Sequence, residues 1–334
     1  MGAMPLASVI GHRPVIDLLR QAVRLGRVPQ ALMFAGPDGV GKRTVALALA
    51  QAVNCPNVKD GDACGTCGTC QRIARGQHSD VAYIDPAGEA SIRIRTLRER
   101  VLDVLGYRPF EAKRRVYIID QADALTDEAQ DALLKTLEEP PSAATLILIT
   151  AYPDTLRPTI QSRCRRLRFG PLAEADVATV LVDRCGVSRA DAPGLAAASA
   201  GSVAVALAEQ AGELAEDRRA AFELLLSAAR GPHVTTRLKA ATMLVQHESD
   251  RRDREALGMR LAVAASLLRD LGVLATGGRT ALANADVETD LRRLAAAYDL
   301  RRVAGAFAAL TQAQRALDRN ASPKIVADWV AITI

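Results

Sequence analysis

Ala31-Leu-Met-Phe-Ala-Gly-Pro-Asp-Gly-Val-Gly-Lys42 is the stretch that decides the fold of this chain. The run Ala31–Ala35 has the length and apolar character of a short buried strand, and it stops at Gly36. Gly36–Lys42 then has the spacing G-x-x-x-x-G-K, and a helical pattern over Thr44–Val53 follows. A strand, a glycine-rich loop and a helix in this order predict a phosphate-binding loop, whose backbone N–H groups and helix N-terminus face phosphate oxygens.

The sequence around this loop predicts a parallel α/β domain. Short apolar runs predict four more strands, at Val81–Asp85, Arg115–Asp120, Leu146–Thr150 and Arg166–Phe169. Apolar residues at helical spacing predict helices at Val15–Leu25 and Asp127–Glu139, the second of which is stopped by Pro140 and Pro141. Strands that alternate with helices are the pattern that a parallel sheet requires.

After Gly170 the strand patterns end and helical patterns continue to the last residue. Helices are predicted at Glu174–Cys185 and 189–200, and later breaks are few, chiefly Gly231-Pro232 and Gly277-Gly278. We therefore expect an α/β domain over residues 1–170, a small helical lid over 171–205 and a helical C-terminal domain over 206–334.

Composition narrows the class of protein. With 334 residues, 49% hydrophobic and 24% charged, the chain has room for two or three globular domains. A net charge of +5 is mild and leaves contact with nucleic acid open. No long apolar run predicts a membrane span, and residues 1–5 lack the pattern of a secretory signal. We expect a cytoplasmic protein.

The phosphate loop departs from a hydrolysing site in two places. Gly36, Gly39 and Gly41 let the backbone turn around phosphate, and Lys42 is the residue that reaches the β- and γ-phosphates. The next position, which should hold Mg²⁺ through a hydroxyl, is Arg43. Thr44 comes one residue late and therefore points about 100° away on a helix.

The acidic motif also departs from that of a hydrolysing site. Asp120 ends its predicted strand, where a carboxylate faces the metal, but the residue after it is Gln121 instead of a glutamate that activates water. We expect bound ATP or ADP without turnover, and a glycine-rich turn without a ligand remains the other interpretation.

Four cysteines predict a metal site. Cys55-x8-Cys64-x2-Cys67-x2-Cys70 has the spacing with which four thiolates surround one tetrahedral Zn²⁺. A structural zinc in a reducing compartment is favoured over a redox or iron–sulfur centre. Whether the module only stabilises this insertion or also contacts a partner stays open. The remaining cysteines, Cys164 and Cys185, are expected to be small buried apolar residues.

Three further segments, together with the loop and the cysteines, resemble one family. They are 132–141 (Ala-Leu-Leu-Lys-Thr-Leu-Glu-Glu-Pro-Pro), 146–158 and 159–164 (Thr-Ile-Gln-Ser-Arg-Cys). They are similar to the AAA+ clamp-loader subunits of the bacterial replicase, strongly over about residues 6–205 and beyond that only in helical layout. Within this family, Arg43, Gln121 and the length of the chain resemble the delta-prime type more than the tau/gamma motor type.

The resemblance implies a role in trans. Arg163, in Ser162-Arg163-Cys164, matches the arginine that completes a neighbouring subunit's ATP site, and Thr150 matches a sensor position. The implied partners are the tau/gamma motor subunit, the delta subunit, the sliding clamp and primer–template DNA. The C-terminal helices, with an apolar stripe at Leu261, Ala264, Ala265 and Leu268, would form a ring collar.

Two other classes remain as alternatives. One is a catalytically active AAA+ motor, and the other is a non-enzymatic, zinc-dependent DNA-binding module whose binding would be tight and sensitive to salt. A nucleotidyl transferase is disfavoured, because no pair of carboxylates has a polymerase-like setting. The resemblance implies membership of the polymerase holoenzyme, and any polymerase activity would belong to that complex.

Overall fold

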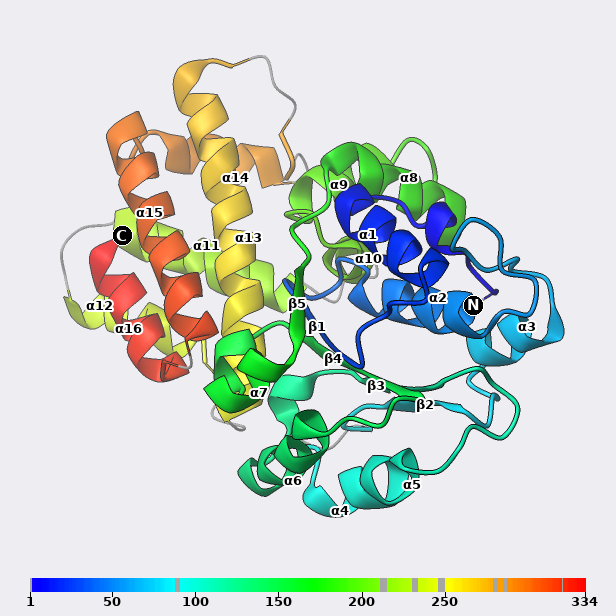
Figure 1. Ribbon diagram of the computed structural model, residues 1–334. Coiled ribbons are helices and arrows are strands. Elements are labelled where there is room, and N and C mark those ends of the chain that lie inside the picture. Colours follow the sequence, from blue (N-terminus) through cyan, green and yellow to red (C-terminus); the bar gives the residue numbers. More distant parts are fainter. Residues whose placement is uncertain are drawn as a thin grey trace. The chain divides into compact units, whose positions relative to one another are not determined.

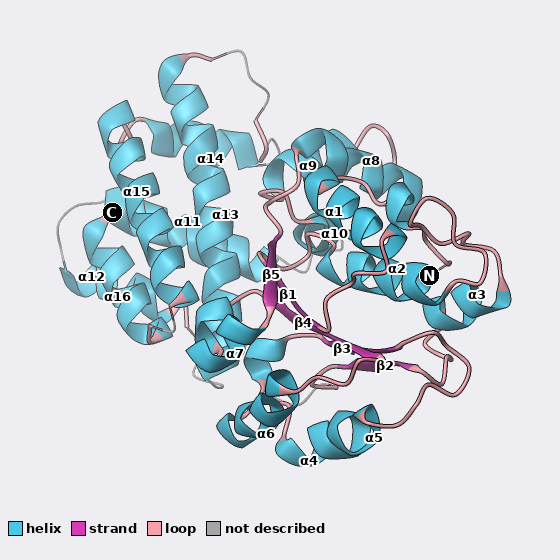
Figure 2. Ribbon diagram, viewed as in Figure 1, coloured by secondary structure: helices cyan, strands magenta, loops and turns pink. Residues whose placement is uncertain are grey.

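The chain divides into two compact units, Met1–Leu172 and Ala173–Ile334. The computed structural model describes residues 2–87, 91–210, 215–229, 234–245, 250–278, 282–284, 287–319 and 321–334. The first unit contains the sheet, and the described secondary structure of the second unit is helical (Figures 1 and 2).

The sheet of the first unit has five parallel strands in the order β2-β3-β4-β1-β5. The strands are β1 (Ala31–Ala35), β2 (Val81–Ile84), β3 (Arg115–Ile119), β4 (Ala144–Thr150) and β5 (Arg165–Arg168). Each lies within two residues of the segment that its apolar pattern predicts. The expected α/β class with a parallel sheet is therefore confirmed.

Helices cover both faces of this sheet (Figure 1). One face packs against α1 (Arg13–Arg24), α2 (Lys42–Asn54) and α3 (Gly68–Ala74), and the other against α4 (Ile94–Leu97), a π-helical turn (Arg98–Leu102), α5 (Asp103–Leu105), α6 (Asp127–Glu138) and α7 (Pro158–Arg163). Side chains alternate between the faces along each strand. In β1, Leu32 and Phe34 belong to the core under α2, whereas Met33 belongs to the opposite core. Both faces are apolar, as a doubly covered parallel sheet requires.

The second unit is helical, and its large apolar core is built from residues within 220–334. Its described helices are α8 (Glu174–Cys185), α9 (Ala192–Ala198), α10 (Val203–Gln210), α11 (Ala215–Ala229), α12 (Val234–Thr242), α13 (Asp250–Thr276), α14 (Glu288–Ala295), α15 (Leu300–Asp318) and α16 (Pro323–Thr333). Gly277 follows α13 in a left-handed conformation, with φ of 62°, which ends the helix as predicted. The other predicted break, at Gly231-Pro232, lies outside the described residues.

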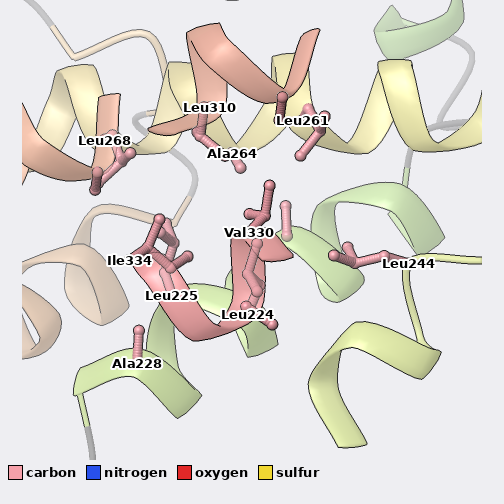
Figure 3. Close-up of a cluster of buried hydrophobic side chains, with 14 of the residues drawn as sticks. Leu224, Leu225, Ala228, Leu244, Leu261, Ala264, Leu268, Leu310, Val330 and Ile334 are labelled. Atoms are coloured by element: carbon pink, nitrogen blue, oxygen red, sulfur yellow. The ribbon is translucent and has the colours of Figure 1, made fainter. Parts of the chain in front are cut away.

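The apolar stripe of α13 is used inside the second unit. Leu261, Ala264 and Leu268 are at most 1% exposed and pack with α11, α15 and α16 (Figure 3). Ala265 packs against the same core from a partly buried position. These side chains therefore form internal core of their own unit, which apolar residues at helical spacing do more often than they form an interface. The ring collar, which rests on the resemblance and not on this stripe, stays a prediction.

Two smaller expectations have different outcomes. Cys164 is buried as expected, but Cys185, the last residue of α8, is exposed. Among the described helices, none alone has the length and apolar character to cross a bilayer, and one bent pair, Ala192–Ala198 with Val203–Gln210, meets that test only when joined.

Candidate functional site

The phosphate loop joins β1 to α2 with its glycines in conformations that L-residues rarely adopt. Gly36, Gly39 and Gly41 have φ of 156°, 75° and 99°. A Cβ on Gly36 would lie 1.9 Å from the carbonyl oxygen of Phe169, so only glycine lets the loop pass the end of β5. A Cβ on Gly41 would meet no atom within 4 Å. The loop is therefore tight against the sheet and open above Gly41, as a phosphate-binding backbone requires.

Lys42 is fixed at the first turn of α2. Its side chain is 4% exposed, and Nζ donates to the carbonyl oxygens of Gly36 at 2.5 Å and Pro37 at 2.6 Å. A third, longer contact of 3.3 Å reaches Oδ1 of the exposed Asp38. An ammonium group has three donors, so the two carbonyls orient the charge inside the loop, and the third donor, now on the exposed Asp38, can turn to a phosphate. The residues present thus fit a phosphate chain.

Asp120, the carboxylate that was expected to face a metal, is bonded to other groups of the protein. The Arg43 guanidinium carbon lies 4.0 Å from the centroid of the Tyr83 ring, a cation–π contact. The Tyr83 hydroxyl donates to Oδ2 of Asp120, and the backbone N–H of Gln121 donates to Oδ1 at 2.9 Å. Both oxygens of Asp120 therefore already accept a hydrogen bond.

This network keeps Tyr83 protonated. Burial raises the pKa of the Tyr83 phenol above its ordinary value, and the hydrogen bond to the Asp120 carboxylate raises it further. The phenol therefore remains a donor to Asp120 at every physiological pH. The residues do not fit a magnesium ion, since the hydroxyl ligand is absent at position 43 and Asp120 is engaged.

The other predicted nucleotide residues lie near the loop in different settings. Thr44 is half-buried on the first turn of α2. Thr150, at the end of β4, is buried, and its hydroxyl donates to Oδ1 of Asp123 at 2.7 Å and accepts from the Tyr152 N–H at 3.0 Å. Thr150 is thus bonded to the turn after β3, beside the loop but directed at Asp123.

Two residues of this site were missed by sequence reasoning. Tyr83 lies in a strand that was predicted, but its contact with Asp120 depends on the pairing of β2 with β3. His12 precedes α1, and its Nε2 lies 2.8 Å from the carbonyl oxygen of Val40, inside the loop. The His12 ring also packs edge-on against Phe169, with centroids 4.9 Å apart. The order of strands in the sheet is the information that would have revealed the first contact.

The four cysteines converge at the other end of α2. Cys55 follows the last residue of α2, Cys67 precedes α3 and Cys70 lies within it. All four sulfur atoms lie within 4.8 Å of one another, and the Sγ atoms of Cys55 and Cys67 are 4.0 Å apart. Thiolates bound at about 2.3 Å around a tetrahedral ion lie about 3.8 Å apart. The cluster can therefore hold a metal ion.

The thiols of Cys55, Cys64 and Cys70 differ in pKa. Hydrogen bonds from the backbone of Thr66 and Cys67 lower the pKa of the Cys64 thiol to about 6. Burial raises the pKa values of Cys55 and Cys70 above the ordinary range. Two buried, protonated thiols beside a thiolate are a donor set that a bound cation would ionise.

The cysteine loop is anchored to the N-terminal segment of the chain. Asp62 is buried, and its carboxylate accepts from the N–H groups of Leu6 at 2.7 Å and Ala7 at 2.8 Å. A Cβ on Gly61 would lie 2.0 Å from the carbonyl oxygen of Arg20 in α1. The loop is therefore built into the first unit and does not hang from it.

Arg163 lies apart from the loop, at the C-terminal end of α7. Its guanidinium donates to Oε1 of Glu138 at 3.0 Å and to the carbonyl oxygen of Thr159 at 3.1 Å. Its side chain is 35% exposed. A permanently charged group is thus presented at the surface of the first unit, held by a half-exposed ion pair.

Comparison with known proteins finds similarity in the first unit. Residues 11–173 match the family model described as DNA polymerase III, delta subunit. Residues 11–173 form a DNA polymerase III delta-subunit-like domain. The chain is 34% identical over 170 residues to DNA polymerase III subunit gamma of Buchnera aphidicola, covering 51% of this chain and 46% of that protein. It is 37% identical over 166 residues to subunit tau of Escherichia coli, covering 50% of this chain and 25% of that protein.

The matched residues thus span less than half of the length of these relatives. Two solved structures are similar over more of the chain. A DNA polymerase III gamma subunit-related protein of Thermotoga maritima has a TM-score of 0.41 at 19% identity, covering 90% of this chain and 98% of its own. The RuvB Holliday junction branch migration motor of the same organism has a TM-score of 0.42 at 16% identity, covering 85% and 83%.

Proposed function

We propose that this chain is a delta-prime-type subunit of a bacterial sliding-clamp loader. In this role it does not hydrolyse ATP itself, and it supplies Arg163 to the ATP site of a neighbouring motor subunit. The delta-subunit-like domain and the gamma and tau relatives support the clamp-loader part of the proposal. The assignment to the delta-prime type depends on the chemistry of the loop.

One observation carries the loss of hydrolysis. Asp120, the carboxylate expected to face Mg²⁺, accepts hydrogen bonds at both oxygens, and Arg43 stands where a hydroxyl ligand is needed. The neighbouring Gln121 has an amide in place of a general base. A nucleotide in this loop would therefore lack both the metal and the base that cleave its γ-phosphate.

The exposed guanidinium of Arg163 supports a role between subunits. The group is planar, always charged and able to donate two parallel hydrogen bonds to phosphate oxygens. Its partner Glu138 is 54% exposed at the side chain, so the ion pair is solvated and weak enough to exchange for a phosphate. We propose that Arg163 leaves Glu138 for the γ-phosphate of the neighbour during clamp loading.

The remaining parts of the proposal follow the layout of the chain. The cysteine module, residues 55–70, holds a structural zinc ion. Residues 171–205 act as a helical lid and 206–334 as the domain through which subunits assemble. The partners are the motor and delta subunits, the sliding clamp and, through the assembly, primed DNA.

A catalytically active motor is the second candidate. It is favoured by the names of the relatives, which are gamma and tau subunits. It requires Mg²⁺-dependent hydrolysis by this chain alone, which the surroundings of Asp120 oppose.

The test is reconstitution with motor and delta subunits and the clamp. With Arg163→Ala, hydrolysis at the adjoining site should fall by roughly 10³–10⁵-fold, as for other arginine fingers. Total ATPase should then fall by that site's share, and clamp loading should be lost. The matched control is Arg165→Ala, which removes an exposed arginine of β5. Clamp loading by the Arg163→Ala assembly at the wild-type rate would show that Arg163 has no such role.

A further inference from the structure

The first turn of α2 combines an intact phosphate-binding side with an altered metal-binding side. On the phosphate side, the glycine loop is open above Gly41 and the ammonium group of Lys42 is oriented by two carbonyl groups. The helix behind it, Lys42–Asn54, is long enough to present its positive N-terminus to an anion. These features suit a chain of phosphates.

On the metal side, the guanidinium of Arg43 is linked to the Asp120 carboxylate through Tyr83. Arg43 follows Lys42 directly, is exposed, and lies over the ring of Tyr83. The hydroxyl of that same ring is bonded to Asp120. Arg43, Tyr83 and Asp120 thus form one connected group at the mouth of the loop, with a guanidinium where a divalent ion is normally recruited.

A magnesium ion would meet three obstacles here. It prefers octahedral oxygen ligands and gives up its waters reluctantly, yet no hydroxyl ligand follows Lys42. At Asp120 it would compete with the Tyr83 phenol and the Gln121 N–H, each of which already donates to one carboxylate oxygen. It would also be repelled by the guanidinium on the Tyr83 ring. A phosphate chain meets none of these obstacles, because the guanidinium attracts it.

We propose that this loop binds a nucleoside diphosphate or triphosphate without a divalent metal, with Arg43 as the counter-charge that Mg²⁺ supplies elsewhere. The inference deepens the proposed function, since it explains how a non-hydrolysing subunit retains nucleotide. Tyr83 acts as a positioning residue, because its ring supports the guanidinium and its hydroxyl occupies Asp120.

The test is isothermal titration of the full chain with ADP and with ATP, in EDTA and in excess Mg²⁺. The wild type should bind with the same Kd in both conditions. In Arg43→Thr, which removes the cation and adds a hydroxyl, the Kd in EDTA should rise roughly tenfold to hundredfold, the cost of losing a charged hydrogen bond. Added Mg²⁺ should then restore part of the affinity.

Two further variants separate this account from a loss of folding. Tyr83→Phe keeps the ring under Arg43 but frees Asp120 Oδ2, so Mg²⁺ should begin to tighten binding. Arg95→Thr, which removes an exposed arginine paired with Glu99 on the surface, should match the wild type in both buffers. Thermal unfolding of each variant verifies that the protein is folded.

Two outcomes would overturn the inference. One is wild-type binding that needs Mg²⁺, and the other is no binding of either nucleotide in either buffer. Neither outcome touches the donor role of Arg163, which needs no nucleotide in this loop. Conversely, an Arg163→Ala assembly that loads clamps normally would remove the proposed function and leave the titration result standing.

Discussion

The phosphate loop and the four-cysteine cluster lie at the two ends of one helix, α2, and they differ in what their polar groups contact. At the N-terminal end, the oxygens of Asp120 accept from Tyr83 and Gln121, and Arg43 lies beside them. At the C-terminal end, four sulfur atoms within 4.8 Å of one another converge on one point. At the first end, protein groups contact the carboxylate that was expected to face a metal, whereas at the second end four sulfur atoms can hold a metal ion.

The two ends illustrate the different consequences of losing a catalytic metal and losing a structural metal. A catalytic Mg²⁺ can be lost without loss of the fold, because the surrounding strands and helices are held by two apolar cores. A structural metal contributes to folding itself. The loop 55–70 contributes few residues to the core, so we expect its thiols, together with the anchor at Asp62, to hold it in place.

The largest expected effect is at the cysteine end. The wild type should contain one zinc per chain by elemental analysis, and Cys70→Ser should lose it. The free energy of unfolding should then fall by several kcal/mol, since structural zinc contributes about 10–16 kcal/mol in isolated zinc fingers. Cys185→Ser, at the exposed cysteine of α8, is the control and should change neither quantity. A Cys70→Ser protein with unchanged metal content and stability would remove the contrast between the two ends.

A different loop, which includes Phe110 and Lys113, packs on the C-terminal end of α2 and is held by Asp80. Its side chain is 0% exposed and accepts from the N–H groups of Phe110 and Glu111, each at 2.8 Å. The loop continues to Lys113, whose Nζ donates to the carbonyl oxygen of Cys55. Asp80→Asn should lower the free energy of unfolding by about 1–3 kcal/mol, because a buried hydrogen-bond acceptor loses its charge. Urea unfolding measures this, with the exposed Asp17→Asn as control.

The same residue gives a pH dependence of known sign. Burial opposes ionisation of Asp80, but hydrogen bonds from Glu111, Phe110 and Ala112 outweigh it and hold the pKa below its ordinary value of 3.8. The folded state therefore binds fewer protons than the unfolded state, and the contribution is complete above pH 3.8 and lost as pH falls through the folded pKa. The stability difference between wild type and Asp80→Asn should shrink in that acid range. A difference that is constant from neutral to acid pH would contradict this assignment.

At the other end of α2, Lys42→Ala should affect nucleotide binding. Removal of the buried ammonium group should raise the Kd for ADP roughly tenfold to hundredfold in EDTA. Fluorescence titration with a labelled ADP measures this, and Lys59→Ala, at an exposed lysine, should bind as the wild type does. Equal affinity in Lys42→Ala would mean that the nucleotide does not occupy the loop.

The smallest expected effect concerns the ion pair that holds Arg163. Glu138→Gln should change the free energy of unfolding by less than about 1 kcal/mol, because both side chains are substantially exposed. Thermal unfolding at low and high salt measures this. A large loss of stability would mean that changes at Arg163 act through folding and not through a neighbour's ATP site.

Sequence patterns predicted the elements of the sheet but not the contacts made across it. β1 and α8 begin and end where the apolar patterns do, and β4 starts only two residues earlier than predicted. The short turns 94–105 were missed, because their helical segments are too short for a period to emerge. Apolar periodicity reports which face of an element is buried, and this is sufficient to predict that helices pack on both faces of a sheet.

The two replaced positions, Arg43 after the phosphate loop and Gln121 after β3, could also be predicted, since a fixed spacing defines each position. The contacts that Asp120 makes with other groups of the protein could not be predicted. The contact between Tyr83 and Asp120 joins residues 37 positions apart and depends on the neighbouring positions of β2 and β3. The same limit applies to the stripe on α13, whose helical spacing is equally suited to an internal core and to a subunit interface.

The most direct test of the central claim is ATP hydrolysis by the purified chain alone, in Mg²⁺, compared between wild type and Lys42→Ala. If the metal side of the loop has been replaced by Arg43, Tyr83 and Asp120, both proteins should release phosphate only at the background rate. Mg²⁺-dependent turnover by the wild type that disappears in Lys42→Ala would contradict the account and favour an active motor.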